Sequence, residues 1–515
     1  MKNTLFICAA IACMATTPLF SQDATVNKII EIGRNDNRVM HQLDVLTNRF
    51  GGRPIGSDAY DNAAEWMIRQ YKSWGLEAHL EEAGTLPVGF NRGPWFGRAL
   101  GLDGVNNLHF ATPSYTSGTK GLQRGHVVME PLTKAQFDRI KGKLKGAWVL
   151  INGKSAGWPI DRSPGGDSIR QKIVQDNIEI DQKNQQLSRR NWENNEKNAM
   201  IPYKEFPGLF YKEMCEAGAL GFIQSAAVPI CALYDRKMID CMTFDDLPEQ
   251  PEIKLDEHQF VLIRQAVRER RTFELEFDIR NHFKLGPVKY HNVVASIKGS
   301  KYPNEYVIIS GHLDAFDVAT GGVDCGTGIG PMMEAARMLA LSGAKPKRTI
   351  LFIAFAGEEF GLLGAQAWAK QHASELPKIA NLFNRDGGPL PPVGISVPKA
   401  MYDDFVKISK PIKTIRPDYP FEVTTREPRR RPSQIGGTDA SVYAVHGVPT
   451  LGFLTDDLKG YDFSYGEIWH TERDLYTKNI PEYQEHAATV TAIMALGVGN
   501  LDKQLSREGL YLDDK

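Results

Sequence analysis

Strand-like and helix-like segments alternate from His291 to the end of the chain, and this alternation constrains the fold more than any other feature of the sequence. Apolar runs that indicate buried strands occupy residues 306–310, 349–356, 380–384 and 448–454. Helical spacing of apolar residues follows the first run and ends at Gly343, and a second helix is expected at 361–373. Strands separated by helices pair in parallel and carry helices on both faces of the sheet. We therefore expect an α/β fold with a mixed, mainly parallel sheet sandwiched by helices.

The stretch from 107 to 285 has a different character. Short strands are expected at 147–151 and 272–279, and residues 216–223 indicate a helix end that turns into a strand. Residues 167–199 are rich in Asn, Gln, Lys and Glu, which predicts an exposed helical insertion. With 515 residues the chain is too long for one ordinary core. We interpret 107–285 as a β-rich module inserted into a larger domain.

The segment before this module contains one clear helix, at residues 60–74. Its apolar residues lie on one face, Ser57 or Asp58 caps its start, and Gly75 ends it. A glycine-rich loop with the character of a turn, residues 51–57, precedes the helix.

The first 21 residues read as an export signal. Lys2 supplies a small basic region, and the apolar run at 5–15 is too short to span a bilayer. Cleavage after Ser21 gives an exported protein, periplasmic or secreted, and a weak lipoprotein signal ending at Cys13 is the alternative. No later run of 18 apolar residues occurs, so no membrane span is expected.

Charge and cysteine content limit the kinds of partner and metal site that we expect. The net charge of −1 gives no reason to expect nucleic acid as a partner. In an exported protein Cys231 and Cys241 are able to form a disulfide, although sequence alone does not establish the pairing. The cysteines have no CxxC spacing, so we expect no zinc site built on sulfur.

Residues of the kinds that bind metals follow four of the predicted strands. They are His312, Asp314, Glu358, Glu359, Asp386 and His470. Sites in open α/β sheets lie beyond the carboxyl ends of the strands, so these side chains are expected to converge. Acids and histidines are common in loops, which explains one such placement but not four. Two imidazoles and three carboxylates are able to bind two divalent ions if one carboxylate bridges them.

His312 and Asp314 are two residues apart, so in extended backbone they point to the same side. His312 is then expected to bind a metal while Asp314 accepts its other ring N–H or steadies a neighbour. The alternative is an ordinary surface turn. Asp324 lies in the glycine-rich stretch 321–328, where small residues let the backbone approach closely, and it is placed to bridge two metals.

Glu358 and Glu359 are neighbours whose side chains must diverge. One can bind a metal while the other stays free as a general base near a shared water. The alternative is a solvated helix N-terminus, where Glu is electrostatically favoured. Asp386 alone gives a plain turn signal, and His470 has Asp474 nearby as a supporting carboxylate.

As a set, these blocks resemble the co-catalytic di-zinc exopeptidases, which include leucyl aminopeptidases, glutamate carboxypeptidases and glutaminyl cyclases. The likeness is greatest to the plasma glutamate carboxypeptidase (carboxypeptidase Q) branch. It covers most of the chain after Val288 and continues more weakly in 52–77 and in the insert. It rests on residues 312–318, Asp324, 356–361, 386–388, 436–439, 447–449 and 456–457.

The resemblance implies domain limits and a site. A signal peptide at 1–21 is followed by a catalytic domain made of 22–106 and 286–515, interrupted by a protease-associated-like domain at 107–285. One zinc is implied on His312, Asp324 and Asp386, and the other on Asp324, Glu359 and His470, so that Asp324 bridges two zinc ions.

The remaining roles are implied in the same way. Glu358 is the base that activates the bridging water and later protonates the leaving amine, and Asp314 orients His312. Tyr461 or Tyr465 adds a donor for the oxyanion. The sequence departs from the pattern at Cys325, where relatives often have a polar or acidic residue. This cysteine is expected to make the activity sensitive to oxidation or to tune the properties of the metal. One arginine of 429–431 either binds a substrate carboxylate or belongs to a solvated loop.

The function expected is hydrolysis of short peptides or dipeptides by an exported zinc metalloexopeptidase of the aminopeptidase or dipeptidase type. The alternatives are a carboxypeptidase, a glutaminyl cyclase on the same fold, and a metal-free binding protein. The resemblance also allows a homodimer.

Overall fold

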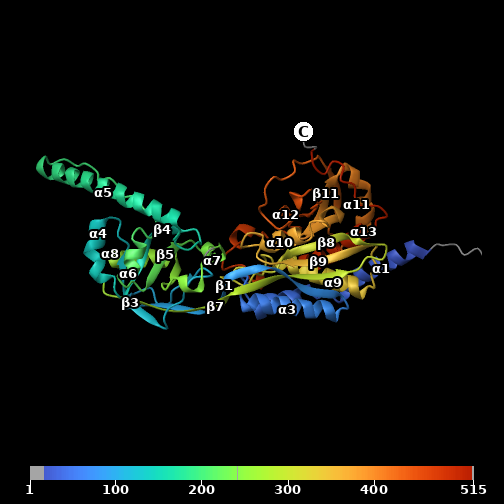
Figure 1. The fold of residues 1–515 in the computed structure, drawn as a ribbon, viewed down its shortest axis with the longest axis horizontal. Coiled ribbons are helices and arrows are strands. Elements are labelled where there is room, and N and C mark those ends of the chain that lie inside the picture. The colour runs from blue at the N-terminus through green and yellow to red at the C-terminus, as the bar shows by residue number, and fades with distance from the viewer. Residues whose placement is uncertain (1–16, 241, 513–515) are drawn as a thin grey trace, which may run out of the picture.

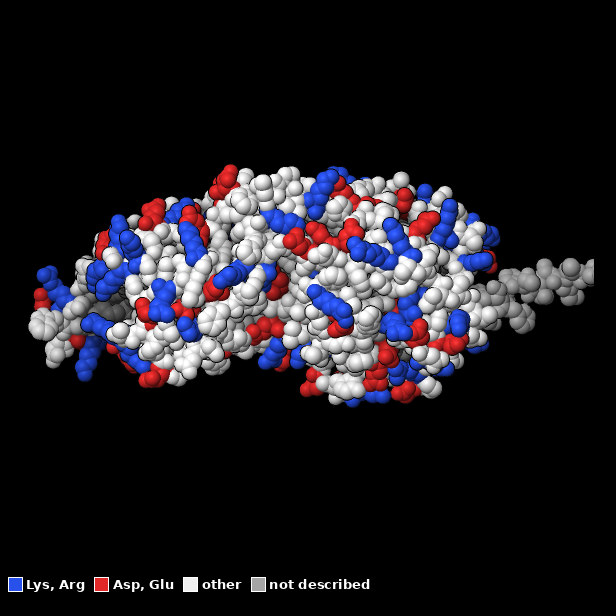
Figure 2. Space-filling view, turned by 90° about the horizontal axis from the view of Figure 1, so that it is seen from below, with Lys and Arg blue, Asp and Glu red and all other residues white. Residues whose placement is uncertain are grey.

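Two lobes joined by a pair of long antiparallel strands make up the molecule (Figure 1). The computed structural model describes residues 17–240 and 242–512. The larger lobe holds the N-terminal helices and most of the chain after residue 286, and the smaller lobe holds most of residues 101–273. Acidic and basic side chains are interspersed over the face drawn in Figure 2.

The secondary structure alternates along most of the chain. The helices are α1 (Thr17–Asn35), α2 (Val39–Asp44), α3 (Asp58–Ser73), α4 (Lys134–Ile140), α5 (Pro164–Glu193), α6 (Tyr211–Glu216), α7 (Arg236–Asp240), α8 (Glu257–Arg268), α9 (Gly326–Leu341), α10 (Leu363–Gln371), α11 (Tyr402–Ser409), α12 (Ala440–Ala444) and α13 (Pro481–Gly499). The strands are β1 (Glu77–Leu100), β2 (Phe110–Ala111), β3 (Gln123–Met129), β4 (Ala147–Ser155), β5 (Gly221–Ala226), β6 (Glu252–Asp256), β7 (Glu274–Ile297), β8 (Tyr302–His312), β9 (Arg348–Phe355), β10 (Ile379–Asn384), β11 (Pro392–Pro398), β12 (Glu422–Arg426) and β13 (Phe453–Thr455).

The sheet of the larger lobe runs in the order β10-β8-β9-β7, with β1 paired to β7. β8 is parallel to β9 and β10, whereas β7 is antiparallel to β9 and β1. Neighbouring residues of a strand face opposite layers. Phe352 of β9 packs in the core shared with α9 and α13, and Ile353 packs in the core shared with α10 and α12. The expected α/β sandwich is therefore confirmed.

The smaller lobe is built on the parallel strands β3, β4, β5 and β6, and it joins the same sheet through β7. β7 supplies Phe277 to the core of this lobe, where the ring packs at 4.7 Å from Trp148, and Val293 to the core of the larger lobe. One strand thus belongs to both cores. The predicted domain limit at 285/286 falls inside β7, and the domain limits stay a prediction.

Helix α5 projects from the smaller lobe as an arm (Figure 1). Asn177, Asn184 and Asn191 lie seven residues apart on it, and each clamps one residue of the returning chain at 198–204. In each case the amide oxygen accepts from a backbone N–H at 2.8 Å, and the amide nitrogen donates to the carbonyl of the same residue at 2.9 Å. The exposed helical insertion predicted at 167–199 is confirmed for 167–193, whereas residues 194–199 are not helical.

The predicted helix at 60–74 is α3. Ser57 is its cap, because its side chain accepts from the backbone N–H of Tyr60 at 3.0 Å. Gly75 follows the helix with a φ of +87°, a conformation that favours glycine.

The strand predicted at 448–454 is wrong for most of its length, since only Phe453–Thr455 forms a strand, β13, in a separate small sheet with β11 and β12. Residues 448–451 run beside the edge strand β10 without forming a ladder. Pro449 has no N–H to donate, and only its carbonyl is used, by the N–H of Leu382 at 2.9 Å. The side chain of Asn381 replaces the ladder by bonding both the N–H and the carbonyl of Leu451.

The export signal falls largely on residues 1–16, outside the described residues, and its cleavage point after Ser21 falls within α1. Across 17–240 and 242–512, no helix combines the length and the apolar character needed to cross a bilayer. Cys231 has a free thiol, and its suggested disulfide partner Cys241 lies outside the described residues.

Candidate metal centre

Three parallel strands deliver most of the predicted site to one edge of the sheet. His312 is the last residue of β8, Glu358 and Glu359 follow the end of β9 at Phe355, and Asp386 follows the end of β10 at Asn384. His470 arrives from the loop between β13 and α13. The side chains meet because carboxyl ends of parallel strands share an edge.

The first cluster centres on His312, which is 1% exposed. Its Nδ1 donates to the backbone carbonyl of Asp314 at 2.9 Å, which directs Nε2 toward the carboxylates. Nε2 lies 3.2 Å from Oδ1 of Asp324 and 3.5 Å from Oδ1 of Asp386. These three donors form one compact group.

The second cluster centres on His470. Its Nε2 lies 2.9 Å from Oε2 of Glu359 and 3.6 Å from Oδ2 of Asp324. Asp324 thus directs one oxygen to each histidine, as a carboxylate that bridges two ions must. Burial lowers the pKa of His470 to about 4, so the ring is neutral, the form in which imidazole binds a metal.

The electrostatics favour cations. Asp314, Asp324, Glu359 and Asp439 are all buried or nearly so, beside Glu358 and Asp386. Burial raises the pKa of Glu358 to about 8, and burial also raises the pKa of Glu359 well above its ordinary value. One oxygen of Glu359 has no hydrogen-bond partner. Imidazole and carboxylate donors that are crowded and partly unsatisfied fit divalent zinc, which would relieve their mutual repulsion.

Of the two roles expected for Asp314, the structure shows contacts that steady neighbouring residues and no hydrogen bond to the ring of His312. Its Oδ1 lies 3.7 Å from His312 Nδ1, too far for a hydrogen bond, and the backbone carbonyl takes that role instead. The carboxylate accepts from the backbone N–H of Glu358 at 3.1 Å and of Glu359 at 3.2 Å. Asp314 therefore fixes the turn that carries the two glutamates.

Asp474 also differs from expectation. The sequence predicts that it supports His470, but its Oδ1 accepts from the backbone N–H of Val323 at 2.6 Å and of Asp324 at 3.2 Å. Burial raises the pKa of Asp474 to about 7. The His470 loop thus holds the backbone of Asp324.

Arg53, part of the predicted turn-rich loop at 51–57, is completely buried beneath the site. Its guanidinium donates to five backbone carbonyls, those of Leu46, Gly51, Leu313, Thr320 and Gly321, at 2.7 to 3.4 Å. Three of these belong to the segment between His312 and Asp324. A lone arginine among glycines is a weak signal, because carbonyl acceptors are not visible in a sequence.

Asp439 is a residue to which the sequence reasoning gave no separate role, although it lies in the resembling block 436–439. It is 1% exposed, neither carboxylate oxygen has a hydrogen-bond partner, and burial, followed by the charge of Glu358, raises its pKa well above the ordinary value. It adds a further buried acid to the cluster.

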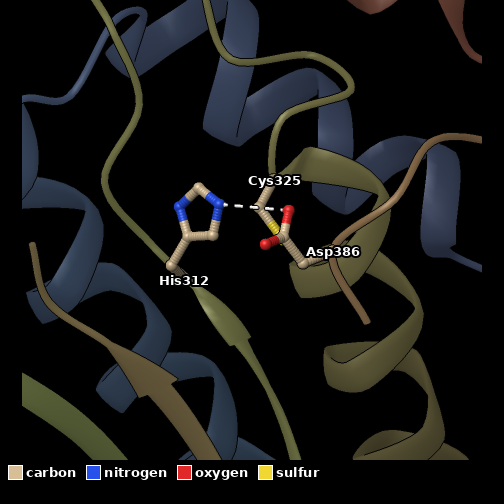
Figure 3. A group of neighbouring side chains, drawn as sticks. All are labelled: His312, Cys325 and Asp386. Carbon is tan, nitrogen blue, oxygen red and sulfur yellow. Dashed lines mark ion pairs between the residues drawn. The ribbon is translucent and has the colours of Figure 1, made fainter. Parts of the chain in front are cut away.

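Cys325 lies against the first cluster (Figure 3). Its Sγ, the ring nitrogen of His312 and a carboxylate oxygen of Asp386 all lie within 4.8 Å of one another. The thiol donates to the backbone carbonyl of Arg385 at 3.1 Å, and burial raises its pKa to about 11.

The two candidate tyrosines differ in exposure and in surroundings. Tyr461 is exposed, and its hydroxyl donates to Glu482 at 2.9 Å. Tyr465 is half-buried with its ring next to Gly388, two residues after Asp386, and burial, followed by the charges of Asp324 and Asp386, raises its pKa. Arg429 pairs through its backbone with Tyr511 near the C-terminus, and Arg430 is exposed. A role for these arginines in substrate binding stays a prediction.

Comparison with known proteins gives a consistent result. The chain matches the model of Peptidase family M28 over residues 292–494. It is 32% identical over 486 residues to Carboxypeptidase Q of Rattus norvegicus, which covers 92% of this chain and 88% of the relative. It is 29% identical over 495 residues to Carboxypeptidase Q of Homo sapiens, with the same coverage of 92% and 88%.

Of two further comparisons, one covers a short part of the chain and the other shows a likeness of fold. Over 108 residues, 19% of this chain and 23% of the relative, the chain is 41% identical to a Probable zinc metalloprotease of Pyrenophora teres f. teres (strain 0-1). The solved Peptidase M28 precursor from Shewanella amazonensis SB2B has a TM-score of 0.57 at 20% identity and covers 95% of this chain and 98% of that one, which shows a shared fold. On the identity and coverage of its relatives, the chain belongs to peptidase family M28, a family of co-catalytic zinc exopeptidases, and it is a hydrolase that acts on peptides.

Proposed function

We propose that this protein is an exported exopeptidase of the aminopeptidase or dipeptidase type that works with two zinc ions. One ion would be held by His312, Asp324 and Asp386, and the other by Asp324, Glu359 and His470. The observation that supports this most strongly is the placement of Asp324, with Oδ1 at 3.2 Å from one histidine and Oδ2 at 3.6 Å from the other.

Bound zinc would supply Lewis acidity, which polarises a scissile carbonyl and acidifies water. Glu358 is then the general base: it takes the proton of the attacking water and delivers it to the leaving amine. Asp314 holds the backbone of Glu358, so the base and its neighbour Glu359 diverge. The hydroxyl of Tyr465, beside Asp324 and Asp386, is the proposed donor to the developing oxyanion.

The direction of attack is the open choice within this proposal. Relatives named Carboxypeptidase Q favour removal of a C-terminal residue as the second candidate. Both predicted metal groups and Glu358 are present, which weighs against a cyclase with a single zinc and against a metal-free binding protein.

A mass-spectrometric digest of short peptides tests the direction. Each peptide is supplied free, N-acetylated and C-amidated, and the purified mature protein is first shown to contain zinc. We expect cleavage that requires a free N-terminus. Tolerance of the amide then indicates an aminopeptidase, and a need for both free ends indicates a dipeptidase.

The opposite pattern, cleavage of acetylated peptides that requires a free C-terminus, makes the protein a carboxypeptidase. No cleavage of any peptide with zinc bound would refute the exopeptidase assignment, and peptides with N-terminal Gln would then be assayed for cyclisation.

Export, a homodimer and an inserted protease-associated-like domain at 107–285 complete the proposal. Sequencing the N-terminus of the secreted or periplasmic protein checks cleavage after Ser21. Light scattering of the purified protein checks the dimer. Expression of 107–285 alone checks whether that segment folds as a unit.

A further inference from the structure

The loop that carries His470 contacts the segment between β5 and α7 and, through the side chain of Glu472, the smaller lobe. Thr471 forms an antiparallel β-bridge with Cys231, and the N–H of Glu472 donates to the carbonyl of Ile230 at 2.9 Å. Ile230 and Cys231 lie between β5 and α7, in a segment of the chain that packs on the core of the larger lobe. The two residues after a predicted metal ligand are therefore bonded to the segment between β5 and α7.

The side chain of Glu472 adds two contacts to those of the backbone. Its Oε1 accepts from the N–H of Ile230 at 3.0 Å, and its Oε2 lies 2.7 Å from Nε2 of His109. The other ring nitrogen of His109 lies 3.1 Å from Asp256 at the end of β6. The carboxylate of Glu472 thus contacts His109 of the smaller lobe directly, and Asp256 holds the same ring from its other side.

His470 needs such support because its backbone is in the left-handed region, with a φ of +60°. That conformation is unfavourable for a residue with a Cβ and persists only when the surroundings enforce it. The ring itself packs at 4.7 Å from Phe316 of the larger lobe. The ring of His470 therefore packs on the larger lobe, whereas the residues after it are bonded to the segment at 230–231 and, through the side chain of Glu472, to His109 of the smaller lobe.

We propose that Glu472 is a positioning residue, through which the smaller lobe holds His470 in the geometry that binds the second metal. This inference rests on the proposed function, because it takes His470 as a ligand. It makes the smaller lobe part of the metal centre. Loss of the link should weaken the metal on His470 and Glu359 and spare the metal on His312 and Asp386.

Metal titration of the full-length mature protein tests the proposal. The metal-stripped protein is titrated with Zn²⁺ in a competing chelator, and the dissociation constants of the two sites are resolved. His470→Ala first identifies which binding step belongs to His470. We expect Glu472→Ala to weaken that same step 10- to 100-fold, the usual effect of removing a group that supports a metal ligand, and to leave the other step within about twofold.

Glu467→Ala is the matched control. Glu467 is an exposed carboxylate in the same loop and pairs with Arg473 at 3.0 Å, so its removal costs the same charge without touching the smaller lobe. Neither binding step should change in this variant. His109→Ala removes the link from the other side and leaves the loop sequence intact; a selective weakening of the His470 step is again expected.

The outcomes distinguish a failure of the positioning role of Glu472 from a failure of the proposed ligand set. If Glu472→Ala and His109→Ala are folded and keep both dissociation constants, or weaken both steps equally, Glu472 is not a positioning residue. If Glu472→Ala does not fold, His109→Ala decides by the same criterion. If His470→Ala itself leaves both steps unchanged, the proposed ligand set fails and this inference fails with it.

Discussion

The carboxylate of Asp314 accepts a hydrogen bond from the backbone N–H of Glu358 at 3.1 Å. The second oxygen accepts from the next N–H, that of Glu359, at 3.2 Å. Asp314 is completely buried, so the turn that it holds is firmly fixed. Adjacent glutamates are thereby given different surroundings: Glu359 contacts His470 at 2.9 Å, whereas Glu358 is the proposed general base.

Glu358→Gln and Glu359→Gln should therefore fail in different ways. Loss of the base removes proton transfer, so we expect Glu358→Gln to lower kcat about 10²- to 10⁴-fold with both metals retained. Glu359→Gln should lose the metal shared with His470. Metal content per chain and kcat on a cleaved peptide, measured on the same preparations, check this.

The difference in metal content between the two variants tests which glutamate binds the metal and which is the base. If Glu358→Gln releases a metal and Glu359→Gln keeps both, the two roles are reversed. The matched control is Glu65→Gln, the same chemical change at an exposed position of α3, and it should alter neither measurement.

The ligand-type residues were predictable because they follow strand ends, where the sheet topology brings them together. The tasks of Asp314 and Asp474 were not. Asp474 was expected to support His470, and Asp314 to orient His312 or to steady a neighbour; the backbone N–H groups that each of them binds were not visible in the sequence. The role of Arg53 was unpredictable for the same reason, since its partners are carbonyls and every residue has one.

The secondary structure was likewise predictable in some segments and not in others. Apolar periodicity predicted β8, β9 and β10, because a buried strand needs little besides apolar residues. It failed at 448–454, where Pro449 withholds a donor and Asn381 supplies side-chain hydrogen bonds in place of a ladder. The link between Glu472 and His109 spans 363 residues and involves two polar side chains, so no local pattern predicts it.

Arg53→Met should be strongly destabilising. Methionine keeps much of the length of the side chain but removes every donor that five buried or partly buried carbonyls share. We expect a loss of about 3–5 kcal/mol in the free energy of unfolding, because hydrogen bonds from a charged donor are worth about 1.5–3 kcal/mol each and do not add fully. Urea unfolding followed by circular dichroism measures it. Arg69→Met, at an exposed position of α3, is the control, and an equal loss there would contradict the assignment.

Cys325 is expected to position Asp386 through its hydrogen bond to the carbonyl of Arg385, rather than to bind metal. Cys325→Ser keeps a donor and should retain metal affinity within a few fold, whereas Cys325→Ala should weaken the metal on His312 and Asp386 about 10-fold. The Co²⁺-substituted protein provides a second measurement. An intense sulfur-to-cobalt absorption band that disappears in Cys325→Ser would show direct ligation and contradict the positioning role.

Removal of metal should lower the stability of the folded protein. Without cations the crowded carboxylates of Asp324, Glu359 and Asp386 repel one another. At a free zinc concentration about 100 times the dissociation constant, each occupied site adds about 2.7 kcal/mol to the free energy of unfolding. Calorimetric Tm values with zinc and with a chelator check this. The chelator should have a much smaller effect on Asp324→Asn, and an undiminished effect would place the metals elsewhere.

The contact between the lobes should weaken as the pH rises. Burial lowers the pKa of His109, but hydrogen bonds to Glu472 and Asp256 outweigh it, and the net pKa is raised above 6.5. A histidine with a raised pKa in the folded state binds its proton more tightly there than in the unfolded chain. Its stabilising contribution is therefore fully present below pH 6.5 and is lost as the pH rises through the folded pKa.

The Tm of the wild type should accordingly exceed that of His109→Gln most below pH 6.5, and the difference should shrink toward high pH. His258 also contacts Asp256, at 3.1 Å, so the same series is run in a His258→Gln background to isolate His109. His126→Gln is the control, because the ring of His126 contacts the carbonyl of Lys143 rather than a carboxylate. A difference that grows with pH would mean that His109 is held neutral in the folded protein, and the ion pair with Glu472 would then not contribute to the contact between the lobes.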